Sequence, residues 1–553
     1  MISHHKVLWA FSFPLILLLS LSAASGSFLL YRLGDIEMRP WDESLYALRA
    51  KEMYLSGCLI APMQGGEVAW GSGKPPLGFW LILLSFHLFG IGPLALRLPF
   101  ALAGVGCVLL IFLIGQEIGD RRLGLFSAAS LLLMPGFLDY SRRAILEPFL
   151  TFLFLAALLL FHHSHRGSPR KSILYALASG LTIGLAILTK QVVGLVILPA
   201  FLIYEIFSWK KETSNRSLSR LFSIIAAMVA SSIWWFLIMY GRYGSTFVHH
   251  YFEANVLRRL THTITARKTM ARGFHTVLLQ QTDSLPLLAG LIGLLLLLLL
   301  LLRLSRQKGS LPSRPETNSL LLPFLLFSGT YYLIFGLVSR TLLSWYPFPL
   351  LPILALGQGY LLSVCVQAST GQPARGPFPF LSLLLPLLTI ATALSHKLFY
   401  VSIPLVLLSL IHLALLVRGS KGRADLLPIL GLLFLILYFS LGSHLALKSR
   451  TYHSPDPFPE VAKQVKDLGT EEVLFDENIG GGRWDKIHPL RFYLEIPVQK
   501  SQIEPYLRGE EDGKGKLIFT SRDRWMELRG IASGAKSVKF LPGGELITWE
   551  LNG

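Results

Sequence analysis

Long leucine-rich runs constrain this chain more than any other feature. One of them, at residues 283–302, ends in the unbroken leucine run Leu294–Leu302. A helix that crosses a bilayer needs about 20 consecutive apolar residues, and runs of this length recur along the first 450 residues. Only 15% of all residues are charged, against about 25% in soluble domains. These features predict an α-helical polytopic membrane protein.

The apolar runs predict about thirteen membrane spans. The first, about 7–31, is expected to be retained, although Ala23-Ala24-Ser25 would also suit the cleavage site of a signal peptide. The others are expected at 97–117, 123–141, 148–166, 173–189, 191–208, 221–240, 283–302, 320–338, 347–366, 378–395, 399–417 and 426–447. Leu77–Gly90 has only 14 residues, so an interfacial or re-entrant helix is expected there.

The basic residues between the spans predict the topology. With a cytoplasmic N-terminus, the cytoplasmic connections are 118–122, 162–172, 209–220, 303–319, 367–377 and 418–425, and all of them are basic. This agrees with the excess of Lys and Arg in cytoplasmic loops. Counting Leu77–Gly90 as a span would move them all outside. Four features are therefore expected on the outer side: the loop around Asp42, the turn around Glu147, the long loop 241–282 and the tail.

Charge and cysteine content argue against a nucleic-acid-binding protein, a disulfide-stabilised protein and a redox enzyme. The net charge is +18, but residues 451–553 carry 17 acidic and 14 basic residues, which leaves +21 for residues 1–450. This excess fits cytoplasmic loops against anionic lipid better than a nucleic-acid partner. The three cysteines lie far apart, so neither a disulfide framework nor redox chemistry is expected.

Two domains are expected from composition. Residues 1–448 would form the membrane domain, with an outer loop at 32–96, and residues 449–553 a small periplasmic α/β domain. In the tail, the spacing of Phe458, Val461, Val465 and Leu468 is helical. Strands are expected at Val473–Phe475 and Lys516–Thr520, and a hairpin at Ser537–Leu541 and Glu545–Leu551.

Carboxylates on the outer side are the first candidates for chemistry. Asp42 and Glu43 stand together, and Glu147 precedes Pro148 at the outer end of a span. A carboxylate can take a proton from an acceptor hydroxyl or bind a divalent cation. The alternative is that the pair begins a short helix, Ser44 to Tyr54, and that Glu147 caps the next span.

Cationic residues on the same side could bind a phosphate group. Lys74 lies between Gly73 and Pro75, and the loop 241–282 carries six Arg and Lys against the single acid Glu253. Arginine makes bidentate contacts with phosphate. Arg340 and Tyr346 complete the set. The alternatives are snorkelling of Lys74 to the interface and ordinary interfacial aromatics at Trp345 and Tyr346.

Short motifs recur along the first 352 residues. They are Pro40-Trp41-Asp42-Glu43, Tyr46-Ala47, Glu52-Met53, Lys74-Pro75-Pro76, Phe79-Trp80, Ser85-Phe86, Leu88-Phe89-Gly90, Arg97-Leu98-Pro99, Arg143-Ala144, Glu147-Pro148, Leu188-Thr189-Lys190, Gly194, Asn255, Arg258 and Tyr346-x-x-Pro349-x-x-Pro352. Together they resemble the ArnT-like (aminoarabinose transferase-like) family of the GT-C class, whose relatives are the protein O-mannosyltransferases. The match is specific over the first 200 or so residues and looser over 250–352. The tail carries no such motif.

The resemblance implies a glycosyltransferase that uses a polyprenyl-phosphate-linked sugar at the outer face of a bacterial inner membrane. Its implied catalytic residues are Asp42, Glu43 and Glu147, with Asp42 and Glu147 also able to hold Mg²⁺ or Mn²⁺. The donor phosphate would be bound by Lys74, Arg258, Arg340 and Tyr346, and the substrates by Tyr46, Arg143 and Asn255. The acceptor would be a lipid, a glycan or a protein.

Two residues depart from the family pattern, and two other functions stay open. Leu45 and Leu342 stand where aminoarabinose transferases often have arginine and lysine, which argues against aminoarabinose and lipid A as substrates. A transporter or flippase would carry ionisable residues in mid-span or paired broken helices, and the expected spans hold almost none. A receptor-like scaffold would depend on residues 451–553 for partner binding.

Overall fold

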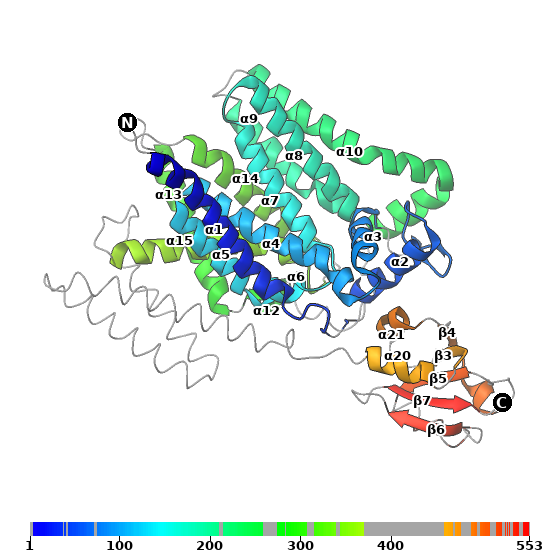
Figure 1. Cartoon of the computed structure of the whole chain (residues 1–553). Coiled ribbons are helices and arrows are strands. Elements are labelled where there is room, and N and C mark those ends of the chain that lie inside the picture. Colours follow the sequence, from blue (N-terminus) through cyan, green and yellow to red (C-terminus); the bar gives the residue numbers. More distant parts are fainter. Residues whose placement is uncertain are drawn as a thin grey trace. The chain divides into compact units, whose positions relative to one another are not determined.

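Figure 1 shows the computed structural model of the chain. It describes residues 4–36, 38–39, 42–70, 74–209, 214–257, 274–282, 284–306, 315–338, 343–369, 458–467, 470–476, 488–494, 498–508, 516–521, 535–540 and 546–551, together with Met526, Leu528 and Gly530. The expected spans at 378–395, 399–417 and 426–447 lie outside the described residues.

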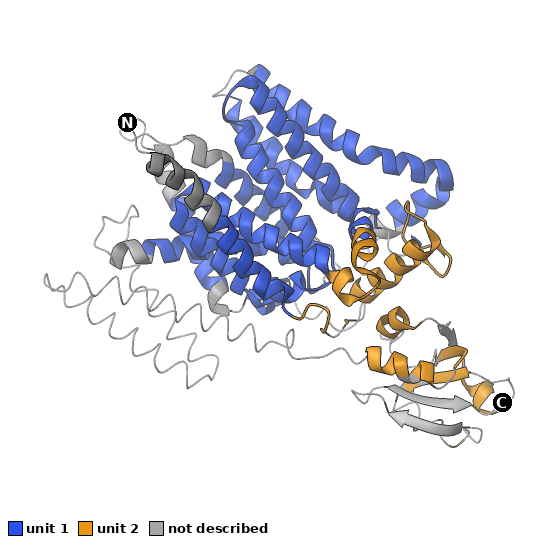
Figure 2. Cartoon of the chain, in the orientation of Figure 1, with its two compact units in different colours: residues 1–31, 70–81, 98–451 blue, residues 32–69, 82–97, 452–553 orange. Residues whose placement is uncertain are grey.

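Contacts divide the chain into two compact units (Figure 2). Unit 1 comprises residues 1–31, 70–81 and 98–451, and unit 2 comprises residues 32–69, 82–97 and 452–553. Composition places the boundary of the tail near Ser449, whereas contacts group the tail with much of the preceding outer loop.

Unit 1 is helical throughout its described part. Its elements are α1 (His4–Leu30), most of α4 (Pro93–Ile118), α5 (Arg121–Leu133), α6 (Pro135–Ser141), α7 (Glu147–Ser164), α8 (Pro169–Lys190), η2 (Gln191–Ile197), α9 (Leu198–Ser208), α10 (Ser214–Val248), η3 (His249–Leu257), α12 (Phe274–Thr282), α13 (Ser284–Arg306), α14 (Pro315–Tyr332), η5 (Leu333–Val338), η6 (Phe348–Leu350) and α15 (Leu351–Ser369). The helix α3 (Leu77–Phe89) begins in unit 1 and ends in unit 2. Its bounds match the short apolar helix expected at Leu77–Gly90.

Five described helical stretches are long and apolar enough to cross a membrane, and up to seven if each of two bent pairs is one span. The five are Pro93–Ile118, Glu147–Ser164, Pro169–Ser208, Asn215–Glu253 and Leu320–Leu337. One bent pair is α5 with α6, which meet at 68° because the chain breaks before Pro135, a residue that cannot continue the helical hydrogen bonds. The expected total of about thirteen spans stays a prediction.

The helices of unit 1 alternate in direction, as the charge pattern predicts. Lys190, at the end of α8, contacts Glu147 at the start of α7. Glu205, near the end of α9, lies 3.1 Å from His165, which follows the other end of α7. The chain therefore reverses between α8 and α9, at Lys190–Gln191. The 40-residue stretch Pro169–Ser208 contains two expected spans.

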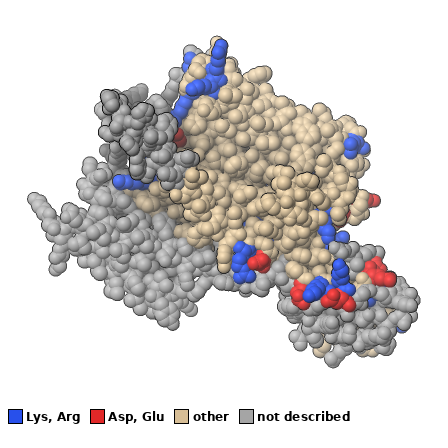
Figure 3. Space-filling view, viewed as in Figure 1, with Lys and Arg blue, Asp and Glu red and all other residues tan. Residues whose placement is uncertain are grey.

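Three connections expected on one side of the membrane lie at the same end of unit 1. Arg166, in the connection 162–172, is 2.7 Å from Glu117 at the end of α4. Arg220, near the start of α10, is 2.9 Å from Glu205. The connections 118–122, 162–172 and 209–220 are thus neighbours. Figure 3 shows a broad surface of unit 1 with almost no charge, as a lipid-facing surface requires.

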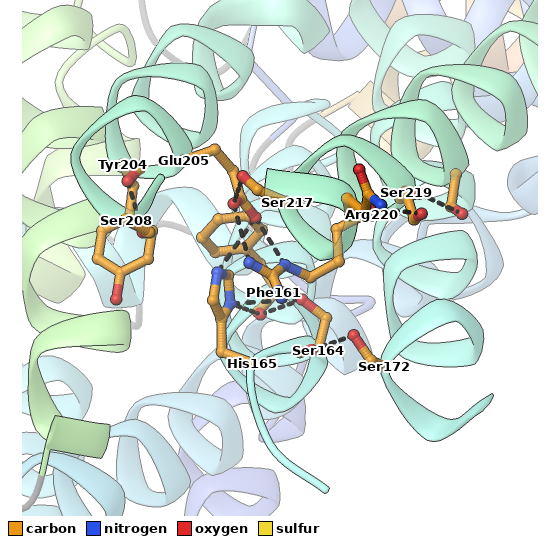
Figure 4. A network of polar contacts seen from close by, with 12 residues as sticks. Phe161, Ser164, His165, Ser172, Tyr204, Glu205, Ser208, Ser217, Ser219 and Arg220 are labelled. Atoms are coloured by element: carbon orange, nitrogen blue, oxygen red, sulfur yellow. Dashed lines mark hydrogen bonds and ion pairs between the residues drawn. The ribbon is translucent and has the colours of Figure 1, made fainter. Parts of the chain in front are cut away.

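A buried polar network joins α7, α9 and α10 at this end (Figure 4). The Glu205 carboxylate accepts hydrogen bonds from both Arg220, at 2.9 and 3.0 Å, and Ser217. Glu205 is fully buried and Arg220 is 2% exposed. Two of the basic residues counted for the topology, Arg166 and Arg220, are therefore paired with acids from the spans, which reduces the free positive charge at this end.

The long helix α10 extends beyond the expected span 221–240 and continues into η3. Residues 241–257 are helical, so the expected outer loop 241–282 is not a loop over its first part. The helix bends at Gly244, whose φ of +52° is unfavourable for residues with a side chain.

Unit 2 contains α2 (Asp42–Ser56) and a five-stranded sheet. The sheet consists of β3 (Glu472–Asp476), β4 (Val498–Ser501), β5 (Lys516–Ser521), β6 (Ala535–Phe540) and β7 (Leu546–Leu551). The remaining elements are the paired short strands β1 (Met63–Gln64) and β2 (Glu67–Val68) and the helices α20 (Phe458–Asp467), α21 (His488–Tyr493) and α22 (Glu504–Leu507). The strand order is β4-β3-β5-β7-β6. β3 is parallel to β4 and β5, whereas β7 is antiparallel to β5 and β6.

The secondary structure expected in the tail is confirmed at each described element. The helix α20 and the strands β3, β5, β6 and β7 lie where the residue pattern predicts them. The helices α21 and α22 and the strand β4 were not predicted. The two helices have only six and four residues, and Val498–Ser501 is short, largely polar and pairs only with β3.

Candidate functional site

Asp42 is the first residue of α2. The helix expected at Ser44 to Tyr54 is confirmed and is longer, Asp42–Ser56, with Asp42 and Glu43 in its first turn. There the positive end of the helix dipole stabilises carboxylates. The side chain of Asp42 is half-buried, and its Oδ2 accepts a hydrogen bond of 3.2 Å from the Tyr46 hydroxyl one turn later.

Glu43 has a different environment from its neighbour. It is 2% exposed, and its Oε1 accepts a hydrogen bond of 2.7 Å from Nε of Arg97, which is fully buried. Its Oε2 accepts another, of 2.9 Å, from the backbone N–H of Arg39. The Arg97 guanidinium also donates to the carbonyl oxygens of Leu33 and Ile36, at 3.0 and 2.8 Å. This pair fastens the segment before α2 to the start of α4.

Arg97 is a residue that sequence reasoning missed as part of the site. Its signals are its place in the Arg97-Leu98-Pro99 motif and its position as a lone arginine at the start of an apolar helix, where a charge needs a partner. Glu43 is thus engaged on both oxygens, and its predicted catalytic role stays a prediction.

Glu147 begins α7, one residue after the N-cap Leu146 and directly before Pro148. Its Oε1 contacts the Lys190 ammonium, and the two side chains are 1% and 7% exposed. The ammonium also lies 5.1 Å from the ring centroid of Tyr346, within range of a cation–π interaction. Tyr346 was predicted as a site residue and Lys190 was not, although a lysine inside the apolar pattern of α8 is a signal of the same kind as Arg97.

The neighbouring backbone holds Lys190 and Tyr346 in place. Gln191, directly after Lys190, adopts φ +59°, which is unfavourable for residues other than glycine and marks the reversal between α8 and η2. The Tyr331 hydroxyl donates a hydrogen bond of 3.0 Å to the carbonyl oxygen of Tyr346. This buried hydrogen bond ties the backbone at Tyr346 to the side chain of Tyr331 on α14.

Removing one charge of the Glu147–Lys190 pair should lower the free energy of unfolding more than removing both charges. Lys190→Met leaves a carboxylate buried without its cation, whereas Glu147→Gln with Lys190→Met leaves a neutral amide. We expect a coupling of about 1–3 kcal/mol in the free energy of unfolding. Denaturant unfolding in detergent of the two single variants and the double variant measures it. Additive losses would show that the pair does not interact.

Two arginines follow α6 and both are buried. Arg142 donates to the carbonyl oxygens of Phe28, Leu29 and Tyr31, at 2.8, 3.2 and 2.6 Å, and so caps the C-terminal end of α1. Arg143, predicted to bind substrate, is 3.0 Å from Asp139.

The remaining predicted residues are placed as follows. Lys74 is 8% exposed. Asn255 lies in η3, but its side chain is not among those described. Arg258 and Arg340 lie outside the described residues. In the loop that was expected to bind phosphate, His249 pairs with Glu253 at 2.6 Å, and His250 stacks on Trp70 at 5.7 Å.

A divalent cation at Asp42 and Glu147 stays a prediction. Within the described ranges, no group of three or more His, Cys, Asp or Glu side chains could hold a metal ion. The Lys190 ammonium already supplies positive charge to Glu147. The residues described at Glu147 therefore do not fit a metal ion while Lys190 is bound there.

A family model described as dolichyl-phosphate-mannose-protein mannosyltransferase matches residues 73–235. Two sequence relatives are similar over parts of the chain. One is a putative mannosyltransferase, YkcB, of Bacillus subtilis, 29% identical over 167 residues, which are 30% of this chain and 23% of the relative. The other is an undecaprenyl phosphate-alpha-4-amino-4-deoxy-L-arabinose arabinosyl transferase of Pseudomonas fluorescens, 28% identical over 360 residues, 64% and 58% of the two chains. The chain thus spans less than two thirds of either relative.

A solved structure matches nearly the whole chain. It is ArnT from Cupriavidus metallidurans bound to undecaprenyl phosphate, with a TM-score of 0.68, 18% sequence identity, and coverage of 98% of this chain and 99% of that one. The likeness shows the fold. The motifs of the first 200 or so residues fall largely within the segment that the family model matches.

Proposed function

We propose that this ArnT-like chain of the GT-C fold is an integral membrane glycosyltransferase. It would move a sugar from a polyprenyl-phosphate-linked donor to a lipid, glycan or protein acceptor at the outer face of a bacterial inner membrane. The family model and the aminoarabinose transferases support this class of reaction. They name two different sugars, mannose and 4-amino-4-deoxy-arabinose, so the sugar stays open.

We assign Asp42 as the general base because its surroundings differ from those of the other two candidate carboxylates, Glu43 and Glu147. Glu43 and Glu147 are buried in ion pairs with Arg97 and Lys190. Asp42 is half-buried and has the Tyr46 hydroxyl as its described hydrogen-bond partner. A general base needs an oxygen that can reach a proton on the substrate, and an engaged carboxylate would have to break its pair first.

The proposed step is one displacement at the anomeric carbon. Asp42 takes the proton of the acceptor hydroxyl, whose oxygen forms the new glycosidic bond. The bond from the anomeric carbon to the phosphate oxygen breaks, and the polyprenyl phosphate leaves with both bonding electrons. Lys74 and Arg258 would stabilise the negative charge that develops on the phosphate. A single displacement inverts the configuration. Glu43 would hold Asp42 in place through Arg97.

Reconstitution with a defined donor tests the proposal. Purified protein in liposomes with polyprenyl-phosphate mannose or polyprenyl-phosphate aminoarabinose, and with total membrane lipid and glycan as acceptors, should release polyprenyl phosphate together with a covalent sugar product. Mass spectrometry detects both. Donor movement between the two leaflets without any covalent product, for either sugar, would contradict a transferase and support a flippase.

A further inference from the structure

The tail helix α21 packs against α2, the helix that begins with Asp42. Lys51 on α2 donates hydrogen bonds to the carbonyl oxygens of Phe492 and Leu494, at 2.8 and 3.2 Å. These carbonyls lie at the C-terminal end of α21 (His488–Tyr493), where the last backbone carbonyls of a helix lack partners within the helix. A cation at this end also complements the negative end of the helix dipole.

Aromatic contacts surround the same lysine. Its ammonium lies 5.9 Å from the centroid of the Phe492 ring, and that ring lies 6.5 Å from the ring of Phe86 on α3. Phe86 is 1% exposed and makes an edge contact with Tyr54 of α2 at 6.1 Å. Phe492 therefore fills a position beside α2 and the second half of α3, and all of these residues belong to unit 2.

We propose that Lys51 is a positioning residue, which docks the tail helix α21 onto α2 and so holds Asp42 in the place that the reaction needs. Lys51 lies nine residues after Asp42, or about 13 Å along one continuous helix. A shift of α2 at one end is carried to the other because a helix moves as a rigid element. The catalytic part of this inference rests on the proposed function, whereas the docking part does not.

A second residue makes the docking sensitive to pH. His488, the first residue of α21, is 4% exposed, and burial, with the positive charges of Arg491 and Arg49, lowers its pKa from 6.5 to about 4. The other charged residues on the helices that pack against α21 are Asp42, Glu43, Lys51 and Glu52 on α2 and Glu460, Lys463, Lys466 and Asp467 on α20. The neutral form is favoured when docked, so docking is strongest above pH 6.5 and weakens as the pH falls toward 4.

Hydrogen–deuterium exchange of the full-length protein measures the docking directly. Lys51→Met should speed exchange of the α21 amides by roughly tenfold, the size expected for losing a charged hydrogen bond, and Lys51→Arg should restore most of the protection. Exchange in the parent protein should also speed up between pH 6.5 and 5, after correction for the intrinsic rate. Lys463→Met is the matched control, because Lys463 is exposed on α20, and it should change nothing.

Steady-state kinetics then separate positioning from a structural role. Lys51→Met should lower kcat by roughly tenfold, in step with the exchange, with KM for the donor unchanged and with rescue by Lys51→Arg. If Lys51→Met does not fold, Phe492→Leu removes the ring contact and should give the same pattern more weakly.

Two outcomes would overturn the inference. Unchanged exchange at α21 in Lys51→Met would show that Lys51 does not dock the tail. Faster exchange with unchanged kcat would show that docking does not position Asp42. Failure of the proposed function would give a different result. The parent protein would then show no sugar transfer, whereas the effect of Lys51→Met on hydrogen exchange at α21 would be unchanged.

Discussion

Asp42→Asn is expected to lower the rate of sugar transfer by about 10²- to 10⁴-fold, the usual contribution of a general base. The amide keeps the size of the side chain and can still accept the hydrogen bond from Tyr46, so the local structure should be kept. It cannot take a proton from the acceptor hydroxyl. Turnover of the polyprenyl-phosphate donor by the reconstituted protein measures the effect, and donor binding by equilibrium dialysis should be unchanged.

A matched variant, Asp35→Asn, shows whether the effect of Asp42→Asn comes from losing the general base or merely from losing a negative charge in the outer loop. Asp35 lies in the same loop, 60% exposed and 2.9 Å from Arg32, so Asp35→Asn removes an equal charge away from α2. It should retain full activity. Tyr46→Phe should give a smaller loss than Asp42→Asn, because it removes only the hydrogen bond to Oδ2. Turnover by Asp42→Asn equal to that of Asp35→Asn would rule out Asp42 as the base.

Arg97→Met is expected to destabilise unit 2 by about 3–5 kcal/mol, the cost of removing one partner of a buried ion pair. The Glu43 carboxylate would stay buried without its cation, and the carbonyls of Leu33 and Ile36 would lose their donor. Hydrogen exchange of the α2 amides measures the change, because these amides lie in the element that the pair fastens.

An exposed pair supplies the comparison for this second prediction. Arg32→Met breaks an ion pair between side chains that are 56% and 60% exposed, which should cost about 0–1 kcal/mol. Glu43→Gln with Arg97→Met should recover part of the loss, since no unpaired charge then remains buried. If Arg97→Met cost no more than Arg32→Met, the Glu43–Arg97 pair would not hold the loop.

The elements of this fold could be predicted well because they follow from local pattern. Apolar length predicted the described spans and the short helix α3, and the positions of basic residues predicted which connections share an end of unit 1. The reversal at Lys190–Gln191 falls between the expected spans 173–189 and 191–208, whereas the positive φ of Gln191 and the bend before Pro135 were not predicted. A proline marks the second, but nothing in the residue type of Gln191 indicates a positive φ.

The chemistry of the site could be predicted only in part, because partners are a tertiary property. Asp42, Glu43 and Glu147 look alike in the sequence, as acids on the expected outer side of the membrane. Which of them is engaged depends on Arg97 and Lys190, which lie 54 and 43 residues away along the chain. No local pattern encodes a contact at that separation.

The contact between Lys51 and α21 also sets an order of events during synthesis. The two partners are separated by 441 residues, and a ribosome adds about 5–20 residues per second, so α2 emerges roughly 20–90 seconds before α21 can exist. The spans described in unit 1 are made in that interval, while the loop that carries Asp42 lacks its tail partner. Unit 2 is therefore completed last. A chain that stops before the tail would contain the described helices of unit 1, but its outer loop would lack the contact with α21.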